Sequence, residues 1–362
     1  ALVTSLVAGL LLFFGIIFLP ATTEPTITIE TDEASDPHSV DPTTTQEEEE
    51  EETNNELDLQ IAHNLAQICH CYAQGKVGSG FDVSSAIYGS HVYTRFSKSI
   101  LSELLPQSPG HDSSTSIDAA LLDTIVTDAE NDVWDCTVKP FSLPQGLELL
   151  MADVCGGSET PSMARKVLSW KQSCTTKDEL RAWNDLIEGN SQIESCIKTL
   201  HNLSNEHNNL FLEVLLEFSC VFGTDWSTVT YDTVDPDSNS LHNKLIVRAA
   251  VIQELTKLRT SFLLVRKHLK QIGVLAGVSI EPDDQTRLAD ATMELPGVVA
   301  AGVPGAGGND ALFVIYIKGP NSNGSSDCVR DSIGDLWKNW ENSGGGNKNG
   351  GGGVVCPLAV RN

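Results

Sequence analysis

Residues 296–317, PGVVAAGVPGAGGNDALFVIYI, hold two apolar runs joined by a glycine-rich segment. Each run is short and is bounded by Gly, Pro, Asn or Asp, as strands commonly are. The segment between them, residues 302–310, contains four glycines. We therefore predict a strand, a glycine-rich turn and a second strand.

The sequence on either side of this pair predicts helices and one more strand. Residues 285–295 and 331–340 have the character of helices, and residues 342–353 form a Gly-rich linker. Beyond the linker, VVCPLAV at residues 354–360 could return as an edge strand.

Residues 177–268 are predicted to be largely helical. The clearest helix carries an apolar stripe at spacings of three and four, made of Leu255, Leu258, Phe262, Val265, Leu269 and Ile272. Lys257, Arg266 and Lys267 lie off that stripe. Further upstream we predict helices at residues 57–74 and 161–171 and strands at 91–96, 134–141 and 147–154. Helices mixed with strands in this way indicate an α+β protein.

Composition narrows the class of partner. The 362 residues suggest about two domains, and the net charge of -26 would repel nucleic acid or an anionic membrane surface. Much of the charge lies in residues 21–56, an acidic stretch with few large apolar residues, which we expect to be a disordered insert. A docking or metal-buffering tail is the alternative. Oligomeric state does not follow from composition.

The first 20 residues, ALVTSLVAGLLLFFGIIFLP, carry no charge and have the length of a membrane span. They lack flanking Lys or Arg, and the chain begins with Ala1. A helix that is apolar all round can also be buried inside a domain. We expect the buried helix, and keep a non-catalytic membrane-anchored protein as the alternative.

Cysteine and histidine give no metal signature. The nine cysteines include no CxxC pair, so we expect scattered reduced thiols. The nine histidines have no paired-ligand spacing, and His63 and His70 are expected on a solvated helix face. The metal ligands stay unknown at this stage.

The first glycine loop, GKVGSGFD at residues 75–82, has the most chemistry. Lys76, Ser79 and Asp82 supply a cation, a hydroxyl and a carboxylate within seven residues. Such a set suits phosphoryl transfer, which needs positioning and charge control near the attacking oxygen. A tight turn in which Asp82 caps the next helix explains the same residues.

Two later loops could also bind a ligand, which for the first of them would be an anion. GGSETPSMARK, residues 156–166, offers hydroxyls and cations where a helix starts. The loop within residues 302–310 lets backbone approach a ligand. An ordinary helix cap and a Gly-rich hairpin are the alternatives.

Taken in order, GKVGSGFD, GSETPSM and GVPGAGG resemble the fungal and plant type of phosphomevalonate kinase, in the GHMP kinase superfamily. The resemblance runs from residue 61 to residue 317. It implies a cytoplasmic enzyme of isoprenoid biosynthesis that uses ATP and Mg²⁺ to convert 5-phosphomevalonate into 5-diphosphomevalonate. Another GHMP kinase, such as a mevalonate kinase, is the alternative.

The resemblance also implies roles for single residues. Asp82 would orient or deprotonate the attacking phosphate, with Lys76 beside it as the second catalytic residue. Phosphomevalonate and its phosphate oxygens would be bound by Ser79, Ser158, Thr160, Ser162 and Arg165. The third loop would close over substrate and phosphates through Gly305, Ala306, Gly307 and Gly308.

The implied architecture is a partial ribosomal-protein-S5-like domain over residues 1–144 and a ferredoxin-like domain over residues 145–362. In this family a nucleotide loop directly precedes a helix that begins Ala-Leu-Val-Thr-Ser-Leu, as residues 1–6 do here. We therefore expect an N-terminally truncated chain that is inactive by itself. Neither nucleic acid nor membrane is expected as a partner.

Overall fold

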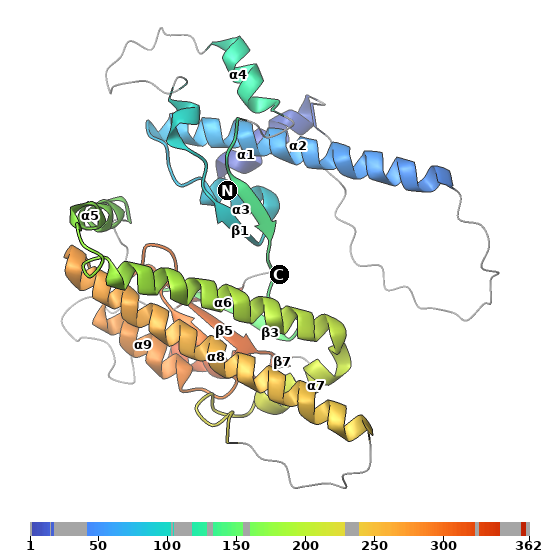
Figure 1. Cartoon of the computed structure of the whole chain (residues 1–362), viewed down its shortest axis with the longest axis vertical. Helices are drawn as coiled ribbons and strands as arrows, with labels where there is room; N and C mark the ends of the chain where they lie inside the picture. The colour runs from blue at the N-terminus through green and yellow to red at the C-terminus, as the bar shows by residue number, and fades with distance from the viewer. Residues whose placement is uncertain are drawn as a thin grey trace. The chain divides into compact units, whose positions relative to one another are not determined.

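The computed structural model describes residues 2–14, 16–17, 42–102, 104, 118–128, 133–154, 160–228, 239–322, 326–340 and 356–359. The chain divides into two compact units, Ala1–Ser142 and Leu143–Asn362. Figure 1 shows the elements of each unit, and each unit is described by itself.

The N-terminal unit is mainly helical. Its elements are α1 (Leu2–Phe13), α2 (Pro42–Gln74), α3 (Phe81–Tyr88), β1 (His91–Thr94), a 3-10 turn (Lys98–Leu101), α4 (Ala119–Val126) and β2 (Thr137–Pro140). Strands β1 and β2 form an antiparallel pair, and α2 packs against α1, α3 and α4.

Helix α2 organises this unit because it contributes to two hydrophobic clusters. Ala62 and Ala66 pack with Val7 and Leu11 of α1. Ile68 and Cys71 belong to the other cluster, which includes Phe96, Leu101 and Trp134. The Trp134 Nε1–H donates to the carbonyl of Ile125 at 2.9 Å, which satisfies the polar atom of this buried ring.

The prediction of an all-round buried helix at the start of the chain is wrong. Helix α1 buries Thr4, Val7 and Leu11, while Leu6 is 62% exposed and Phe13 is 81% exposed. The apolar composition therefore covers both a packed face and an open one. Within the described residues, no helix has the length and apolarity needed to cross a bilayer.

The prediction of disorder over residues 21–56 is wrong for residues 42–56, which are the first part of α2. Glu has a high helix propensity, and Pro42 fits a first helical turn because it needs no N–H partner there. The acidic run therefore continues the amphipathic helix that follows it. Residues 21–41 lie outside the described residues.

The second unit is built on a four-stranded antiparallel sheet in the order β4-β5-β3-β8. The strands are β3 (Leu147–Asp153), β4 (Val298–Gly302), β5 (Ala311–Ile317) and β8 (Cys356–Ala359). Leu150 lies opposite Val314 on one side and Ala359 on the other. The predicted strand pair flanking the glycine-rich turn and the predicted C-terminal edge strand are both confirmed.

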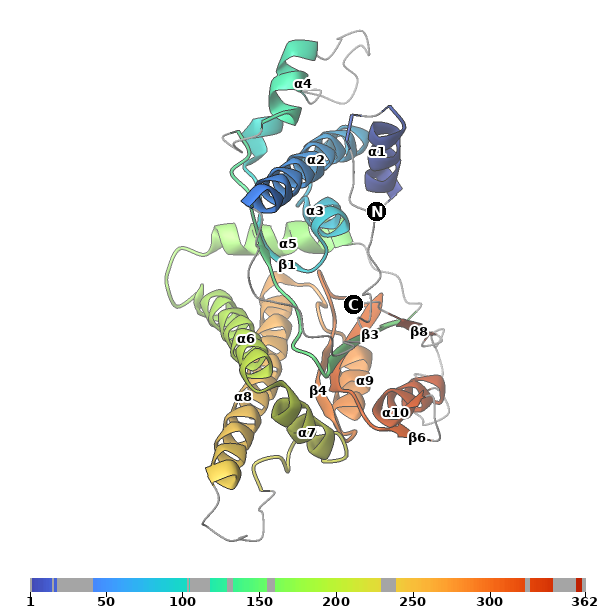
Figure 2. The same cartoon turned by 90° about the vertical axis from the view of Figure 1, so that its right-hand side faces the viewer.

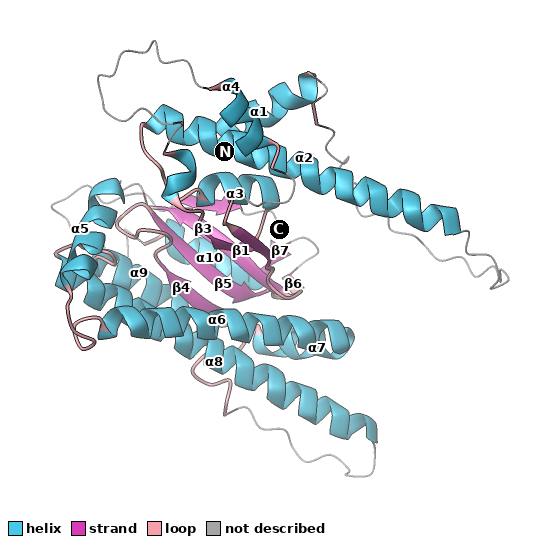
Figure 3. Cartoon of the chain, turned by 45° about the horizontal axis from the view of Figure 1, so that its top comes forward, coloured by secondary structure: helices cyan, strands magenta, loops and turns pink. Residues whose placement is uncertain are grey.

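Helices cover both faces of this sheet, as Figures 2 and 3 show. The helices are α5 (Thr160–Ser173), α6 (Arg181–Glu206), α7 (Asn208–Phe218), α8 (Asn239–Ala276), α9 (Asp283–Met293) and α10 (Cys328–Lys338). Helices α9 and α10 pack on one face, and α7 and α8 contact the other. A short hairpin joins β6 (Asn321–Ser322) to β7 (Ser326–Asp327).

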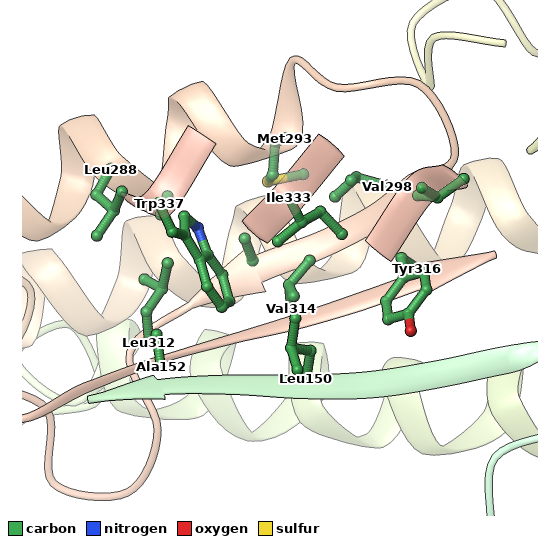
Figure 4. Packing of buried hydrophobic residues seen from close by; sticks show 13 residues of the cluster. Leu150, Ala152, Leu288, Met293, Val298, Leu312, Val314, Tyr316, Ile333 and Trp337 are labelled. Carbon is green, nitrogen blue, oxygen red and sulfur yellow. The ribbon is translucent and has the colours of Figure 1, made fainter. Parts of the chain in front are cut away.

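Alternation along β5 separates the two faces. Leu312, Val314 and Tyr316 point into the cluster formed with α9 and α10, as Figure 4 shows. Phe313 points the other way, and its ring lies 5.8 Å from that of Phe262 on α8. This is the two-residue period of a strand buried on both sides.

Helix α8 has the predicted apolar stripe, with Leu255, Leu258, Val265 and Ile272 buried. Arg266, which the spacing leaves off that stripe, is buried as well. Its guanidinium donates from Nη2 to Glu281 Oε1 at 2.7 Å and from Nε to Glu281 Oε2 at 3.1 Å. Asp290 Oδ1 lies 2.8 Å from Nη2. The spacing of residues within a helix carries no information about a partner 15 residues away. The pair therefore becomes apparent only in the structure.

Replacing Arg266 by Met should destabilise the second unit by about 3–5 kcal/mol, because Glu281 would keep a buried charge with no cation. The matched control is Lys267→Met, one residue further along α8 and exposed, which should change stability by less than about 0.5 kcal/mol. Urea unfolding followed by tryptophan fluorescence measures both. Equal effects of the two variants would contradict a stabilising buried pair.

Candidate functional site

The first glycine loop starts where α2 ends. Gly75 has a φ of 63°; its N–H donates to the carbonyl of Tyr72, and the N–H of Lys76 donates to that of Cys71. These two bonds form the Schellman motif that terminates a helix with a left-handed residue. Gly75 thereby turns the chain, and the Lys76 side chain lies exposed in the loop.

The loop ends at Gly80, the N-cap of α3, with a φ of 79°. A Cβ there would lie 2.7 Å from the Phe96 ring, 2.8 Å from the Tyr93 hydroxyl and 2.9 Å from the Gln67 amide nitrogen. Gly80 is therefore needed for both conformation and space. At Gly78 the nearest atom would be 3.9 Å away, so the structure gives no steric reason for glycine there.

Asp82 lies in the first turn of α3 and does not cap it, because the N-cap residue is Gly80. The capping alternative is therefore wrong. The Asp82 side chain is 52% exposed, and its Oδ2 lies 3.2 Å from His70 Nε2. A carboxylate in the first turn is favoured by the helix dipole. The residue is accessible to a substrate, as the phosphoryl-transfer interpretation requires.

His63 is buried, so the prediction of a solvated position for it is wrong. Its Nδ1 lies 3.1 Å from Asn64 Oδ1, and its Nε2 lies 3.0 Å from Gln67 Nε2. Burial lowers the pKa of His63 from 6.5 to about 4; the hydrogen bond to Asn64 opposes the shift and the charge of His91 adds to it. His63 is neutral at pH 7 and is part of the support behind the loop.

Gln67 connects that support to the loop. Its Nε2 donates to the carbonyl of Gly80 at 2.7 Å. In the same loop, the carbonyl of Val77 accepts from Arg95 Nη2 at 3.4 Å. Sequence reasoning missed both residues. The 63, 67, 70, 74 spacing of polar side chains on one helix face was the available signal for Gln67.

A serine and a histidine also meet near this loop, in a structural role. His91 Nδ1 lies 2.8 Å from the carbonyl of Gly89, which must accept, so Nδ1 carries the proton. Its Nε2 lies 2.8 Å from the Ser84 hydroxyl, from which it accepts when the ring is neutral. Because Ser84 is fully buried, this pair joins α3 to β1 and offers no accessible nucleophile.

The second loop is only partly described. Ser158 lies outside the described residues, and Thr160 is the first residue of α5. Ser162 is half-buried and Arg165 is exposed, both in the first turns of that helix. The predicted helix start at this motif is confirmed, while its anion-binding role stays a prediction.

The third loop joins β4 to β5. Gly305, Gly307 and Gly308 have φ values of 63°, 77° and 98°. A Cβ on Gly307 would lie 2.1 Å from the carbonyl oxygen of Ile280, and the N–H of Gly308 donates to that oxygen at 2.7 Å. The N–H of Gly307 donates to the carbonyl of Pro304 at 3.1 Å. Two of the four predicted phosphate-binding residues therefore use their N–H groups to shape the loop.

The Arg266–Glu281 pair adjoins this loop. A Cβ on Gly302 would lie 3.4 Å from Arg266 Cδ, and Glu281 follows Ile280 directly. The buried pair therefore fixes the segment against which Gly307 and Gly308 close. The predicted site residues fall in both units: the first loop in the N-terminal unit, and the other two loops in the second.

In the parts of the chain that the structure describes, no three His, Cys, Asp or Glu side chains gather as metal ligands would. Mg²⁺ in phosphoryl-transfer sites commonly uses one or two carboxylates together with phosphate oxygens and water. A Mg²⁺ site of that kind needs no cluster of three protein ligands. The cysteines that the structure describes have free thiols.

Known proteins resemble this chain over most of its length. The peroxisomal phosphomevalonate kinase of Arabidopsis thaliana is 36% identical over 261 residues, covering 72% of this chain and 47% of the relative. Phosphomevalonate kinase erg8 of Aspergillus fumigatus is 34% identical over 262 residues, covering 72% and 44%. No protein-family model matches. The chain spans about half the length of the curated relatives it matches.

A solved structure gives a weaker likeness. Streptococcus pneumoniae phosphomevalonate kinase, in complex with phosphomevalonate and AMPPNP, matches with a TM-score of 0.42 and 12% identity, covering 77% of this chain and 58% of that one. This score is too low to establish a shared fold.

The fold is that of an α+β protein. Its first glycine loop leads into a helix whose first turn carries the exposed carboxylate of Asp82. The chain is a homologue of the phosphomevalonate kinases of plants and fungi.

The buried, neutral His63 predicts acid sensitivity of the N-terminal unit. Because its folded-state pKa lies below the unfolded value, protonation favours the unfolded state. The contribution of neutral His63 to the free energy of unfolding is complete above pH 6.5. About 3 kcal/mol of that free energy is lost in total as the pH falls toward 4. The change is measured by urea unfolding at several pH values, followed by the 19F signal of 5-fluorotryptophan at Trp134.

His63→Gln provides the comparison, since Gln does not titrate. The difference in stability between wild type and this variant should narrow from pH 7 to pH 4. A difference that is constant with pH would show that His63 is not held neutral.

Proposed function

We propose that the full-length protein is a phosphomevalonate kinase that transfers the γ-phosphoryl group of ATP to 5-phosphomevalonate. The observation that carries this proposal is the 33–36% identity to four curated phosphomevalonate kinases over 70–72% of the chain. The accessible carboxylate of Asp82, beside a loop that carries Lys76 and Ser79, is consistent with it.

In this reaction the role of Asp82 would be to position the attacking phosphate and to influence its charge. An oxygen of the substrate phosphate bonds to Pγ of ATP while the bond from Pγ to the β,γ-bridging oxygen breaks, and ADP leaves. A phosphate monoester is mostly dianionic at pH 7, so little proton removal is needed. Asp82 would orient the nucleophile, and Lys76 would offset charge on the phosphates.

The other loops would hold substrate and nucleotide. We assign Ser158, Thr160, Ser162 and Arg165 to phosphomevalonate. In the third loop, Gly305 and Ala306 are the better candidates for phosphate contacts, because the N–H groups of Gly307 and Gly308 donate within the protein. ATP is the proposed nucleotide, and Mg²⁺ would neutralise its phosphates and the developing charge.

We further propose that the two units are GHMP kinase domains. In the second unit the chain order β3, helices, β4, β5, α10, β8, with the sheet order β4-β5-β3-β8, supports a ferredoxin-like arrangement. The N-terminal unit would be part of the ribosomal-protein-S5-like domain. A cytoplasmic location stays a prediction; the Arabidopsis relative is named as peroxisomal.

The role of Asp82 is tested by a coupled assay of ADP release. In the full-length gene product, Asp82→Asn should lower kcat by about 100-fold or more, because the variant loses the carboxylate at the reacting phosphate. Asp123→Asn, an equally conservative change at an exposed position on α4, should leave kcat unchanged. Full activity of Asp82→Asn would remove Asp82 from the mechanism.

Arg165 tests the substrate assignment. Arg165→Met should raise KM for phosphomevalonate by about 10–100-fold through the loss of one charged contact, and leave KM for ATP unchanged. The matched control is Arg181→Met, whose side chain is 79% exposed on α6. If mevalonate is the better acceptor in the same assay, the alternative of a mevalonate kinase is the correct one.

A further inference from the structure

A row of four polar side chains runs along α2 toward the first glycine loop. His63, Gln67, His70 and Gln74 follow one another at spacings of four, three and four, which places them on one helix face. Hydrogen bonds connect His63 with Gln67, and His70 with Gln74. The row contacts the loop at two points, through Gln67 and through His70.

The first contact holds the backbone. Gln67 is fully buried, and its Nε2 donates to the carbonyl of Gly80, the residue before α3. Together with the tight fit of Gly80 against Phe96 and Tyr93, this bond fixes where α3 begins. The position of the Asp82 backbone is therefore settled without His70.

The second contact reaches the Asp82 side chain. His70 Nε2 lies 3.2 Å from Asp82 Oδ2, and the His70 side chain is 19% exposed. An ionised carboxylate only accepts hydrogen bonds, so Nε2 must carry the proton in this pair. Gln74 Nε2 lies 2.8 Å from the same nitrogen, so with Nε2 of His70 protonated the Gln74 amide takes the flipped orientation and presents its oxygen.

We propose that His70 is a positioning residue that holds the Asp82 carboxylate in the orientation required for phosphoryl transfer. This inference rests on the proposed kinase function. The Nε2–H, which the Gln74 amide shares, lies against one carboxylate oxygen and leaves the other free to face the acceptor phosphate. It also draws negative charge away from the side on which a dianionic phosphate would approach.

The competing explanation is that the pair stabilises the fold. The contribution to stability expected of such a pair is too small for that role. The pair lies at the surface, with Asp82 half exposed, and exposed ion pairs contribute little to folding. Small displacements of a reacting group, in contrast, can cost about 100-fold in rate. The pair therefore matters more for turnover than for stability.

Kinetics of the full-length protein test the proposal. His70→Leu should lower kcat by about tenfold or more, with both KM values within about threefold of wild type. His70→Gln retains an N–H donor and should recover most of the lost rate. His207→Leu, the same change at an exposed position, should have no effect. Wild-type kcat in His70→Leu would overturn the proposal.

A double variant separates positioning from a general structural effect. If His70 acts through Asp82, His70→Leu should cause no further loss in an Asp82→Asn background. An equal loss of kcat in both backgrounds would contradict the proposal. Urea unfolding of His70→Leu should match wild type within about 0.5 kcal/mol.

A readout without turnover keeps this inference distinct from the proposed function. Crystal structures of the 362-residue chain should show Asp82 in one rotamer bonded to His70 in wild type, and in altered or several rotamers in His70→Leu. An unchanged Asp82 rotamer would overturn the inference. Failure of wild type to phosphorylate phosphomevalonate would instead overturn the proposed function.

Discussion

Two glycines, Gly80 and Gly307, allow the backbone to approach neighbouring groups closely. These approaches shape the first and third glycine loops, both of which the structure describes in full. At Gly80 a side chain would strike Phe96, Tyr93 and Gln67, and at Gly307 it would strike the carbonyl of Ile280. Both residues have positive φ. A residue with a Cβ would meet a conformational cost and a steric one together. The glycines therefore allow the loops to be compact and firmly supported.

The support behind each loop is polar and buried. In the N-terminal unit Gln67 donates to the carbonyl of Gly80 and is itself hydrogen-bonded to His63. In the second unit Arg266 and Glu281 form a bidentate pair beside Ile280, which accepts from Gly308. Buried polar groups are costly unless paired, and once paired they specify one arrangement. The loops thus present Lys76, Asp82, Gly305 and Ala306 from rigid backgrounds.

Sequence reasoning predicted the parts of this structure that depend on local pattern. Apolar runs between turn residues predicted β3, β4 and β5, and three-and-four spacing predicted the buried stripe of α8. It failed where partners distant in the sequence decide whether a polar side chain is buried. Arg266 is buried because Glu281 and Asp290 meet it, and His63 is buried because Trp134 and Gln67 pack on it. It also missed the helical state of residues 42–56, where helix propensity outweighs low hydrophobicity.

We propose that this chain belongs to an enzyme that makes a diphosphate from a phosphate monoester. The most direct measurement is 31P NMR of the full-length protein with ATP, Mg²⁺ and 5-phosphomevalonate. We expect the substrate monoester signal to be replaced by two coupled signals of a new diphosphate, in step with ADP formation. A monoester signal that stays unchanged while ATP is present would contradict the proposal.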